Sequence, residues 1–297
     1  MNINKILEYH PEKHKLTHIL TTCGENILQN LRYDYDGFSN LASRKDEERD
    51  MEETFTYDHL NRLTGIWRNS FRTGWMDYDA YGRMTRKVVD NLLVFTNTVY
   101  TETAKPHAID RADTDLQVFA EHDIAYTSFD KVKHIEQDGN TLDYTYGHDR
   151  QRIFMEEHVG DTTRTKRYLG NCELLTVTTD TDTVSTQWLT YLAGPTGVYA
   201  VVTTDTEGTH TIHYVLKDNL GSWTTITDRH GNIEQELSYD PWGTRRNPDT
   251  WLTWDNQNLE APMFDRGYTG HEHLYAFLKH VREYGYYASL KCGRCIV

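Results

Sequence analysis

The sequence predicts an all-β protein built from antiparallel hairpins, and three observations carry that prediction. Aromatic residues make up 12% of the 297 residues, with 20 tyrosines, which favours a packed fold over disorder. The 19 glycines and 6 prolines, together with frequent threonine, are typical of short strands joined by tight turns. A Tyr-Asp pair also recurs about every 21 residues, a period that fits two strands and two turns.

Charge and hydropathy exclude two classes of partner. The chain carries 31 basic and 45 acidic residues, a formal net charge of −14, so its summed field repels phosphate backbones. Only 37% of the residues are hydrophobic, and no stretch approaches the roughly 20 apolar residues of a membrane helix. We therefore expect no nucleic-acid partner and no membrane insertion. The start of the chain lacks a signal peptide, so as written the chain would stay in the cytoplasm.

Three copies of the repeat align in the first third of the chain, at residues 35–41, 57–63 and 78–84. Each reads Tyr, Asp, two variable residues, a small residue or Asn, then Asn or Arg, then an apolar residue; the copies start 22 and 21 residues apart. We assign structural roles in this repeat to Tyr35, Asp36, Tyr57, Asp58, Tyr78, Asp79, Gly82 and Arg83.

One copy shows how the pattern makes a hairpin. Residues 55–57 alternate apolar and polar side chains as a half-buried strand does, and residues 63–68 form the return strand. Between them, Asp58 is expected to accept a hydrogen bond from the backbone two residues on, and Asn61, like Gly82 in the next copy, tolerates a left-handed conformation. Tyr57 and Leu63 should then face each other, and successive tyrosines should stack along one face.

Weaker copies follow at residues 125–130 and 142–150, which keeps the period approximately. The acidic stretch 107–123 matches the repeat poorly. We interpret it as an insertion within the array or as a poorly matched repeat, and we place no domain boundary there.

The C-terminal third contains four ordered motifs: Leu-Gly-Ser at 220–222, an Asp-x-x-Gly turn ending at Gly231, Tyr-Asp-Pro-Trp-Gly at 239–243, and Thr-Gly-His-Glu at 269–272. With the Tyr-Asp repeats, this order resembles the Rhs or YD-repeat family with its Rhs-associated core, over roughly residues 31–275. The core-motif residues to which we assign structural roles are Leu220, Gly221, Ser222, Gly231, Tyr239, Asp240, Pro241, Trp242, Gly243, Thr269 and Gly270.

The resemblance implies a spiral β-sheet that forms part of a hollow shell in a secreted or cell-surface protein, such as a polymorphic toxin, an insecticidal toxin complex or an adhesion ectodomain. It implies an N-terminal segment at 1–30, a repeat sheet at 31–193, a core segment at 194–275 and a divergent, poorly ordered tail at 276–297. The partners implied are the remaining shell or toxin segments of a longer parent protein. Localisation outside the cell rests on the resemblance alone.

The resemblance ends near Phe277. Toxin members continue into further strands and an aspartyl autoprotease, and neither is present in the tail. We expect a C-terminally truncated product, with a frameshift near codon 277 as one explanation and a genuine standalone product as the other.

The sequence evidence for catalytic and metal sites is weak. Cys292 and Cys295 have the spacing of half a zinc site, but a structural zinc needs two more ligands. His271 and His273 lack the spacing of a metalloprotease helix, and Ser222 is not in a nucleophile elbow. The Asp of each Tyr-Asp pair has a structural role in its turn, which accounts for it without a catalytic role. We therefore expect no cofactor, no metal and no enzymatic activity.

Three functions remain open from the sequence. The first is a non-enzymatic structural fragment of an Rhs shell. The second is a carbohydrate- or cell-surface-binding module that uses Trp223, Trp242, Trp251 and Trp254, although Trp223 and Trp242 also suit the core. The third, disfavoured, is a residual autoproteolytic enzyme or toxin. For a partial wall we also expect association through open strand edges.

Overall fold

The structure is a computed structural model, and it describes residues 3–99, 111–113, 123–137, 139–253 and 261–274. Two large antiparallel sheets and one two-stranded sheet account for the fold, so the all-β prediction is confirmed. In both large sheets each strand pairs with the next one along the chain. Within the described ranges no helix has the length and apolar character needed to span a membrane.

The first sheet has ten strands in chain order. They are β1 (Ile3–Tyr9), β2 (Leu16–Cys23), β3 (Asn26–Tyr35), β4 (Leu41–Asp46), β5 (Met51–Tyr57), β6 (Leu63–Arg68), β7 (Phe71–Tyr78), β8 (Met84–Val89), β9 (Leu92–Val99) and β10 (Arg111–Asp113).

The second sheet has eleven strands, again in chain order. They are β11 (Asp123–Tyr126), β12 (Val132–Gln137), β13 (Asn140–Tyr146), β14 (Arg152–Val159), β15 (Thr162–Leu169), β16 (Cys172–Thr179), β17 (Thr183–Gly194), β18 (Gly197–Thr204), β19 (His210–Lys217), β20 (Trp223–Thr227) and β21 (Ile233–Glu236). A small sheet of β22 (Ser238–Tyr239) and β23 (Arg245–Arg246) follows, and then the 3₁₀ turn η1 (Tyr268–Gly270).

Each Tyr-Asp copy forms the same turn. In the second copy, Asp58 Oδ1 accepts hydrogen bonds from the main-chain N–H groups of Leu60 (2.9 Å) and Arg62 (3.0 Å). Asn61 has φ 60° and Gly82, at the same position in the next copy, has φ 81°, the left-handed conformation expected of both. The ladder register shifts directly before Tyr57, so a β-bulge accompanies the turn.

The repeat tyrosines connect neighbouring hairpins. Tyr57 lies opposite Leu63 in the ladder, as the alternation predicts, and its hydroxyl donates to the Leu41 carbonyl of the preceding hairpin at 2.8 Å. The hydroxyl of Tyr78 donates in the same way to Leu63 at 2.9 Å. The guanidinium of Arg62 lies 4.5 Å from the centre of the Tyr78 ring. Neighbouring hairpins are thus joined by hydrogen bonds from tyrosine hydroxyls to carbonyls and by a cation–π contact of an arginine.

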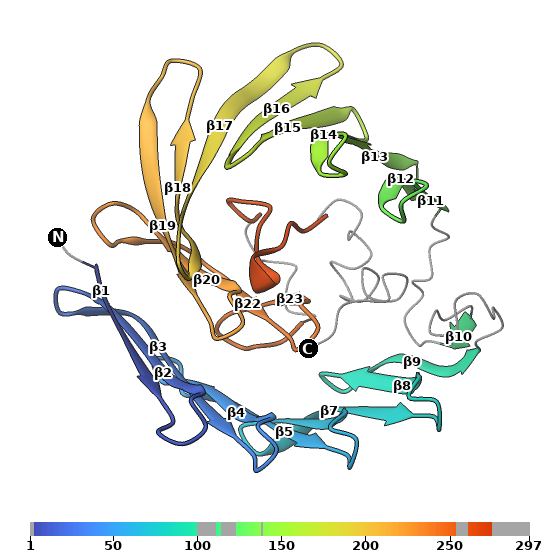
Figure 1. Cartoon of the computed structure of the whole chain (residues 1–297), viewed down its shortest axis with the longest axis vertical. Helices are drawn as coiled ribbons and strands as arrows, with labels where there is room; N and C mark the ends of the chain where they lie inside the picture. Colours follow the sequence, from blue (N-terminus) through green and yellow to red (C-terminus); the bar gives the residue numbers. More distant parts are fainter. Residues whose placement is uncertain (1–2, 100–110, 114–122, 138, 254–260, 275–297) are drawn as a thin grey trace.

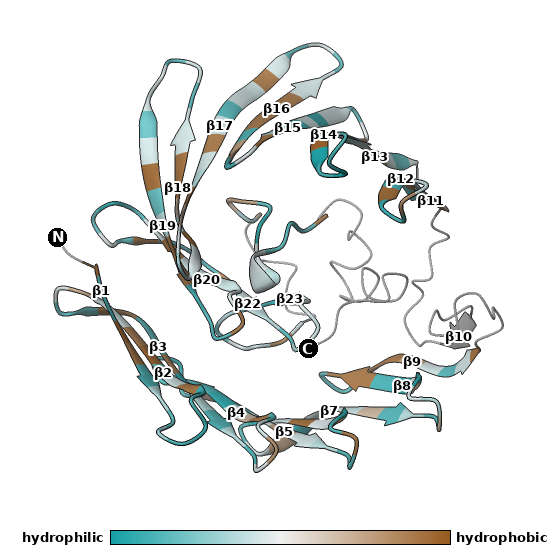
Figure 2. Cartoon of the chain, viewed as in Figure 1, coloured by the Kyte–Doolittle hydropathy of each residue, from teal (hydrophilic) through white to brown (hydrophobic). Residues whose placement is uncertain are grey.

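The two sheets curve around a common interior, and the chain that follows β21 lies inside (Figure 1). Hydrophobic and hydrophilic bands alternate along strands such as β17 and β18 (Figure 2), as expected of strands with one buried face. At one junction, β2 and β3 contact the end of the second sheet. There the Gln29 side-chain amide donates to Thr224 Oγ1 (2.8 Å) and to the Lys217 carbonyl (3.2 Å).

The sequence predicts one continuous array of hairpins, whereas the structure has two large sheets. The first sheet ends at β10 and the second begins at β11, so the stretch 107–123 lies where one sheet gives way to the other. The proposed boundary at 193–194 falls in the β17–β18 hairpin, inside one sheet, and residues 3–30 supply β1, β2 and half of β3. Local patterns indicate hairpins, but the place where a sheet ends depends on packing between distant segments. The tail at 276–297, with Cys292 and Cys295, lies outside the described residues.

Candidate functional site

The most unusual part of the molecule is the chain inside the two sheets, which we call the interior segment (residues 238–253 and 261–274). It contains β22, β23 and η1, and Figure 1 shows it enclosed by the strands. Its aromatic residues pack on both walls. Trp242 packs against Phe55, Ile66 and Met76 of the first sheet, whereas Phe264 belongs to a core with Val201 of the second.

The first sheet holds the interior segment through a buried carboxylate. Glu53 on β5 is 1% exposed, and its two oxygens accept from Arg246 of the interior segment (2.6 Å) and from Arg44 of β4 (2.7 Å). Arg68 adds a third guanidinium, 3.4 Å from Glu53 and 2.5 Å from Asp90. Burial alone would raise the pKa of Glu53, but the three arginines lower it to about 2. Glu53 is therefore a stable anion at the centre of three cations.

The second sheet uses the reverse arrangement, a buried cation among carboxylates. Lys166 on β15 is 1% exposed and its Nζ contacts Asp265 (2.8 Å) and Glu272, both in the interior segment, and Glu173 on β16 (3.5 Å). Burial opposes the charge of Lys166, yet the three carboxylates hold its pKa well above the ordinary value.

Further contacts surround this centre on the second sheet. Arg266 of the interior segment pairs with Glu173 at 2.7 Å. The Tyr168 hydroxyl donates to Glu272 at 2.9 Å. The interior segment is thus bound to each wall through opposite charges.

A second contact with the first sheet involves Lys87 and the Tyr-Asp-Pro-Trp-Gly motif. Lys87 Nζ lies 3.7 Å from the centre of the Trp242 ring, a cation–π distance. Burial lowers the pKa of Lys87 and raises that of Asp240, so the enclosed site disfavours charge on both groups. Asp240 Oδ1 accepts from the N–H groups of Trp242 and Thr244, both at 2.8 Å. This is the same turn that the repeats make.

Three of the four core motifs meet in space. Ser222 is fully buried and its hydroxyl accepts the Thr269 N–H at 3.1 Å, which joins Leu-Gly-Ser to Thr-Gly-His-Glu. The Tyr268 hydroxyl donates to the Pro241 carbonyl at 2.8 Å. Gly243 has φ 89°, and a Cβ there would stand 2.6 Å from the Tyr268 ring.

The remaining core-motif residues occupy turns and sheet edges. Gly221 and Gly231 have positive φ in the Asp218 and Asp228 turns, and Gly231 lies against Cys23 at the junction of the sheets. Leu220 is exposed, Gly270 lies at the end of η1, and the Tyr239 carbonyl accepts from Arg44 at 2.9 Å. The repeat-motif tyrosines end strands β3, β5 and β7 of the first sheet, and the other repeat-motif residues lie in the turns that follow β3, β5 and β7. Tyr57 and Tyr78 share a cluster with Trp242.

His273, which directly follows the last motif, has a structural role. His273 Nε2 accepts the Tyr268 N–H at 2.8 Å, and burial, with His271 nearby, lowers the pKa of His273 to about 4. A neutral ring is what this acceptor role requires. Among the described residues no group of three or more His, Cys, Asp or Glu side chains is placed to hold a metal ion.

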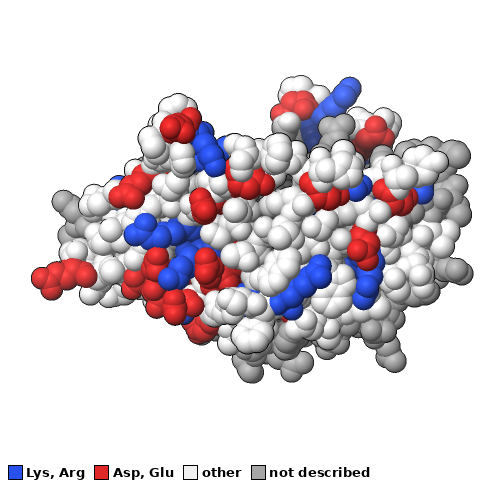
Figure 3. Space-filling model, turned by 90° about the horizontal axis from the view of Figure 1, so that it is seen from below, with Lys and Arg blue, Asp and Glu red and all other residues white. Residues whose placement is uncertain are grey.

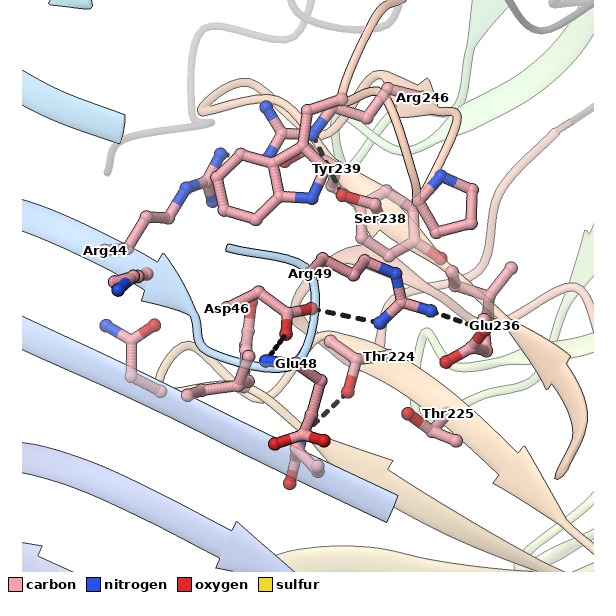
Figure 4. A pocket seen from close by; sticks show the side chains of 18 of the residues that line it. Arg44, Asp46, Glu48, Arg49, Thr224, Thr225, Glu236, Ser238, Tyr239 and Arg246 are labelled. Atoms are coloured by element: carbon pink, nitrogen blue, oxygen red, sulfur yellow. Dashed lines mark hydrogen bonds and ion pairs between the residues drawn. The ribbon is translucent and has the colours of Figure 1, made fainter. Parts of the chain in front are cut away.

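A cavity of about 80 Å³ lies where β3 and β4 meet β20, β21 and the interior segment (Figure 4). Its charged lining is paired. Arg49 bridges Asp46 (3.1 Å) and Glu236 (2.5 Å), and Arg44 pairs with Glu53. These bonds fasten the junction of the two sheets.

The tryptophans proposed for carbohydrate binding are not arranged for it. Trp223 is 1% exposed in the core of the second sheet and Trp251 is 6% exposed beneath Arg246. Trp242 lies half-buried against Lys87, and Trp254 lies outside the described residues. A buried indole cannot stack on a sugar, so the binding prediction is wrong for Trp223 and Trp251, whereas for the half-buried Trp242 it stays a prediction.

Sequence reasoning missed the charged centres. Glu53 lies two residues before Phe55, and Lys166 two residues before Tyr168, so each charge shares a strand face with an aromatic residue. A charge on the apolar face of a strand was the available signal. Its partners in the interior segment are about 100 to 200 residues away, as Arg246 is from Glu53 (a separation of 193), and no local pattern indicates them.

Solved structures resemble this chain in fold. The chain matches TcdB2-TccC3 with a TM-score of 0.67 and 18% identity, over 91% of this chain and 16% of that chain. It matches TcdB2-TccC3 without the hypervariable C-terminal region with a TM-score of 0.65 and 19% identity, over 82% and 15% of the two chains. The Photorhabdus luminescens Tc holotoxin pore gives 0.65 and 18%, over 82% and 14%.

The chain has the fold of part of a Tc toxin chain. This supports the Rhs-like fold that the motifs predict, because toxin complexes are among the proteins that the Rhs resemblance indicates. The chain spans about one sixth or less of the length of the chains it matches. No protein-family model and no curated protein matches the sequence.

Proposed function

We propose that this chain is a non-catalytic structural part of an Rhs-type shell in a secreted or cell-surface toxin-type assembly. The two curved sheets each form a section of the shell wall, and the interior segment binds the two sheets to each other. The observation that carries the proposal is the pair of buried charged centres, Glu53 and Lys166, which bind one segment to both walls. Such centres hold a defined geometry, which suits a scaffold.

The partners proposed are other segments of a longer parent protein. The fold matches only a small part of much longer chains, and β1 is an edge strand with exposed apolar side chains at Ile6, Leu7 and Tyr9. An edge of this kind is a template for a further strand. A wall that continued beyond β1 would cover it.

The absence of catalysis is part of the proposal and has its own test. Asp240 precedes Pro241, but its Oδ1 is occupied by two main-chain N–H groups. Incubation of the purified chain at neutral pH, beside the Asp240→Asn variant, should leave both intact on a denaturing gel. A discrete smaller product from the wild type alone would establish autoproteolysis and overturn the non-enzymatic role.

The shell role is tested from the gene outwards. The gene is first sequenced downstream from codon 270, and one of the three reading frames should encode further core strands. The DNA upstream of the coding region is sequenced next and should encode further repeats. Electron microscopy of the longer product should then show a hollow particle with this chain in its wall. A longer product that forms no such particle, or flanking DNA without any repeat, would contradict the proposal.

A further inference from the structure

Two tryptophans stand on the outward face of the first sheet, away from the interior. On β6 and β7, Ile66 and Met76 point into the core, so their neighbours Trp67 and Trp75 point to the other side. Both indoles are only partly buried. Figure 3 shows the molecule from this side, with charged side chains scattered among uncharged ones. Core packing therefore does not account for these two rings.

Two arginines alternate with the tryptophans. The Arg72 guanidinium lies 5.2 Å from the centre of the Trp67 ring and 5.5 Å from that of the Trp75 ring. The guanidinium of Arg86, on β8, lies 5.2 Å from the centre of the Trp75 ring. Cation–π attraction holds both guanidinium groups in place. We call Trp67, Arg72, Trp75 and Arg86 the outward row.

The arginines of the outward row are not neutralised by strong ion pairs. Arg72 Nη2 donates weakly to the Thr64 carbonyl at 3.4 Å, and among the described residues no carboxylate comes within 4.0 Å of it. Arg86 stands 4.0 Å from Asp77, and both side chains are exposed. On a chain with a net charge of −14, these two arginines keep N–H donors free for an anion.

The row is built into the strand. A Cβ at Gly65 would stand 2.6 Å from two carbons of the Trp67 ring, so the indole lies directly over this glycine. Thr56 and Thr64 lie beside it, with hydroxyl oxygens 3.4 Å apart. Fixed aromatic surface, hydroxyl groups and guanidinium groups without a close carboxylate thus share one outward patch.

We propose that the outward row binds an acidic carbohydrate. The arginines donate hydrogen bonds to carboxylate or sulfate groups, the indoles pack on the apolar faces of the sugar rings, and the threonines bond to sugar hydroxyls. The acidic surface of the rest of the molecule disfavours a long nucleic acid, whose phosphates would extend beyond the outward row onto that surface, whereas a short oligosaccharide contacts the row alone. This site is independent of the shell role.

The test uses the full chain and defined probes. Tryptophan fluorescence is titrated with a sulfated heparin hexasaccharide, with neutral maltohexaose and with hexaglutamate. We expect saturable binding of the sulfated sugar alone, and weaker binding as salt is added. Arg72→Gln should weaken it about tenfold. Gly65→Ala, which displaces the Trp67 ring without changing charge, should also weaken it.

The matched control is Arg32→Gln, because Arg32 is exposed on the same sheet but paired with Glu47 at 2.9 Å. It should change the affinity less than twofold. Circular dichroism melting of each variant separates lost binding from lost fold. No binding of the sulfated sugar, equal loss in Arg72→Gln and Arg32→Gln, or equal binding of hexaglutamate would each overturn the proposal.

Discussion

At the scale of single residues, one aspartate organises each turn of the three clear Tyr-Asp copies. Its Oδ1 accepts the N–H groups two and four residues further along, as Asp58 does from Leu60 and Arg62. The same bonds recur at Asp36, Asp79, Asp205, Asp218, Asp228 and Asp240. The Tyr-Asp repeat and the core motifs therefore use one local device.

This device predicts a graded response at Asp58. Asp58→Ala removes both hydrogen bonds and should lower the free energy of unfolding by about 1 kcal/mol, whereas Asp58→Asn keeps an acceptor oxygen and should cost less. Urea unfolding followed by circular dichroism measures both. An equal loss in the two variants would mean that the side-chain oxygen is not what stabilises the turn.

Glu53 predicts a dependence of stability on acid. Its pKa is about 2 in the folded protein against an ordinary 4.5, so its contribution is complete above pH 4.5 and is lost as the pH falls towards 2. The shift corresponds to about 3 kcal/mol. Glu53→Gln should remove this part of the pH dependence and, by leaving Arg44 and Arg246 without their carboxylate, destabilise the protein at pH 7 by about 3 kcal/mol.

The check is the difference between the two proteins. Urea midpoints of the wild type and Glu53→Gln, measured from pH 7 to pH 2, should converge at the acid end. Parallel curves over the whole range would show that Glu53 does not titrate in the way its surroundings predict.

At the scale of elements, the hairpins are where sequence and structure agree most closely. The pairing of Tyr57 with Leu63 and the left-handed Asn61 follow from local alternation and turn chemistry, and both are present. The change of sheet after β10 does not follow from such rules. Nor do the partners of Glu53 and Lys166, because these contacts join residues far apart in the chain. Turn and register are local properties, whereas the charged centres are tertiary ones.

The open edge at β1 predicts that the purified chain associates with itself. It pairs only with β2 in the first sheet, and Ile6, Leu7 and Tyr9 are 45%, 37% and 56% exposed. Open edges with apolar side chains pair with other chains, and lysine at an edge opposes this. We expect oligomers by analytical ultracentrifugation at micromolar concentration, and a shift towards monomer in Leu7→Lys. A monomeric wild type would contradict the prediction.

At the scale of the whole molecule, the interior segment connects two sheets that differ in the sign of their charged centres. Arg246 binds the anion of the first sheet, and Asp265 and Glu272 bind the cation of the second. Breaking one centre should free part of the interior segment while the strands remain paired. The two walls can therefore be tested separately.

Lys166→Met is the test for the second wall. It removes the buried cation that Glu173, Asp265 and Glu272 share and leaves each of them with one arginine, and it should lower the free energy of unfolding by about 3 kcal/mol. We expect faster proteolysis within 261–274, mapped by mass spectrometry. Lys133→Met, at an exposed position on β12, is the control and should change neither quantity. Equal proteolysis of wild type and Lys166→Met would show that the interior segment is held by other contacts.

The bulge opposite each repeat tyrosine, where the return strand has one extra residue, has a consequence for size. The register shifts before Tyr35, Tyr57, Tyr78, Tyr126 and Tyr146 alike. A bulge bends its strand and adds twist, so every copy contributes a similar increment of arc. Since neighbouring strands lie about 4.8 Å apart, one more copy lengthens the circumference by about 10 Å without altering any existing turn. Duplication of a single repeat would thus widen the curved wall by one fixed increment.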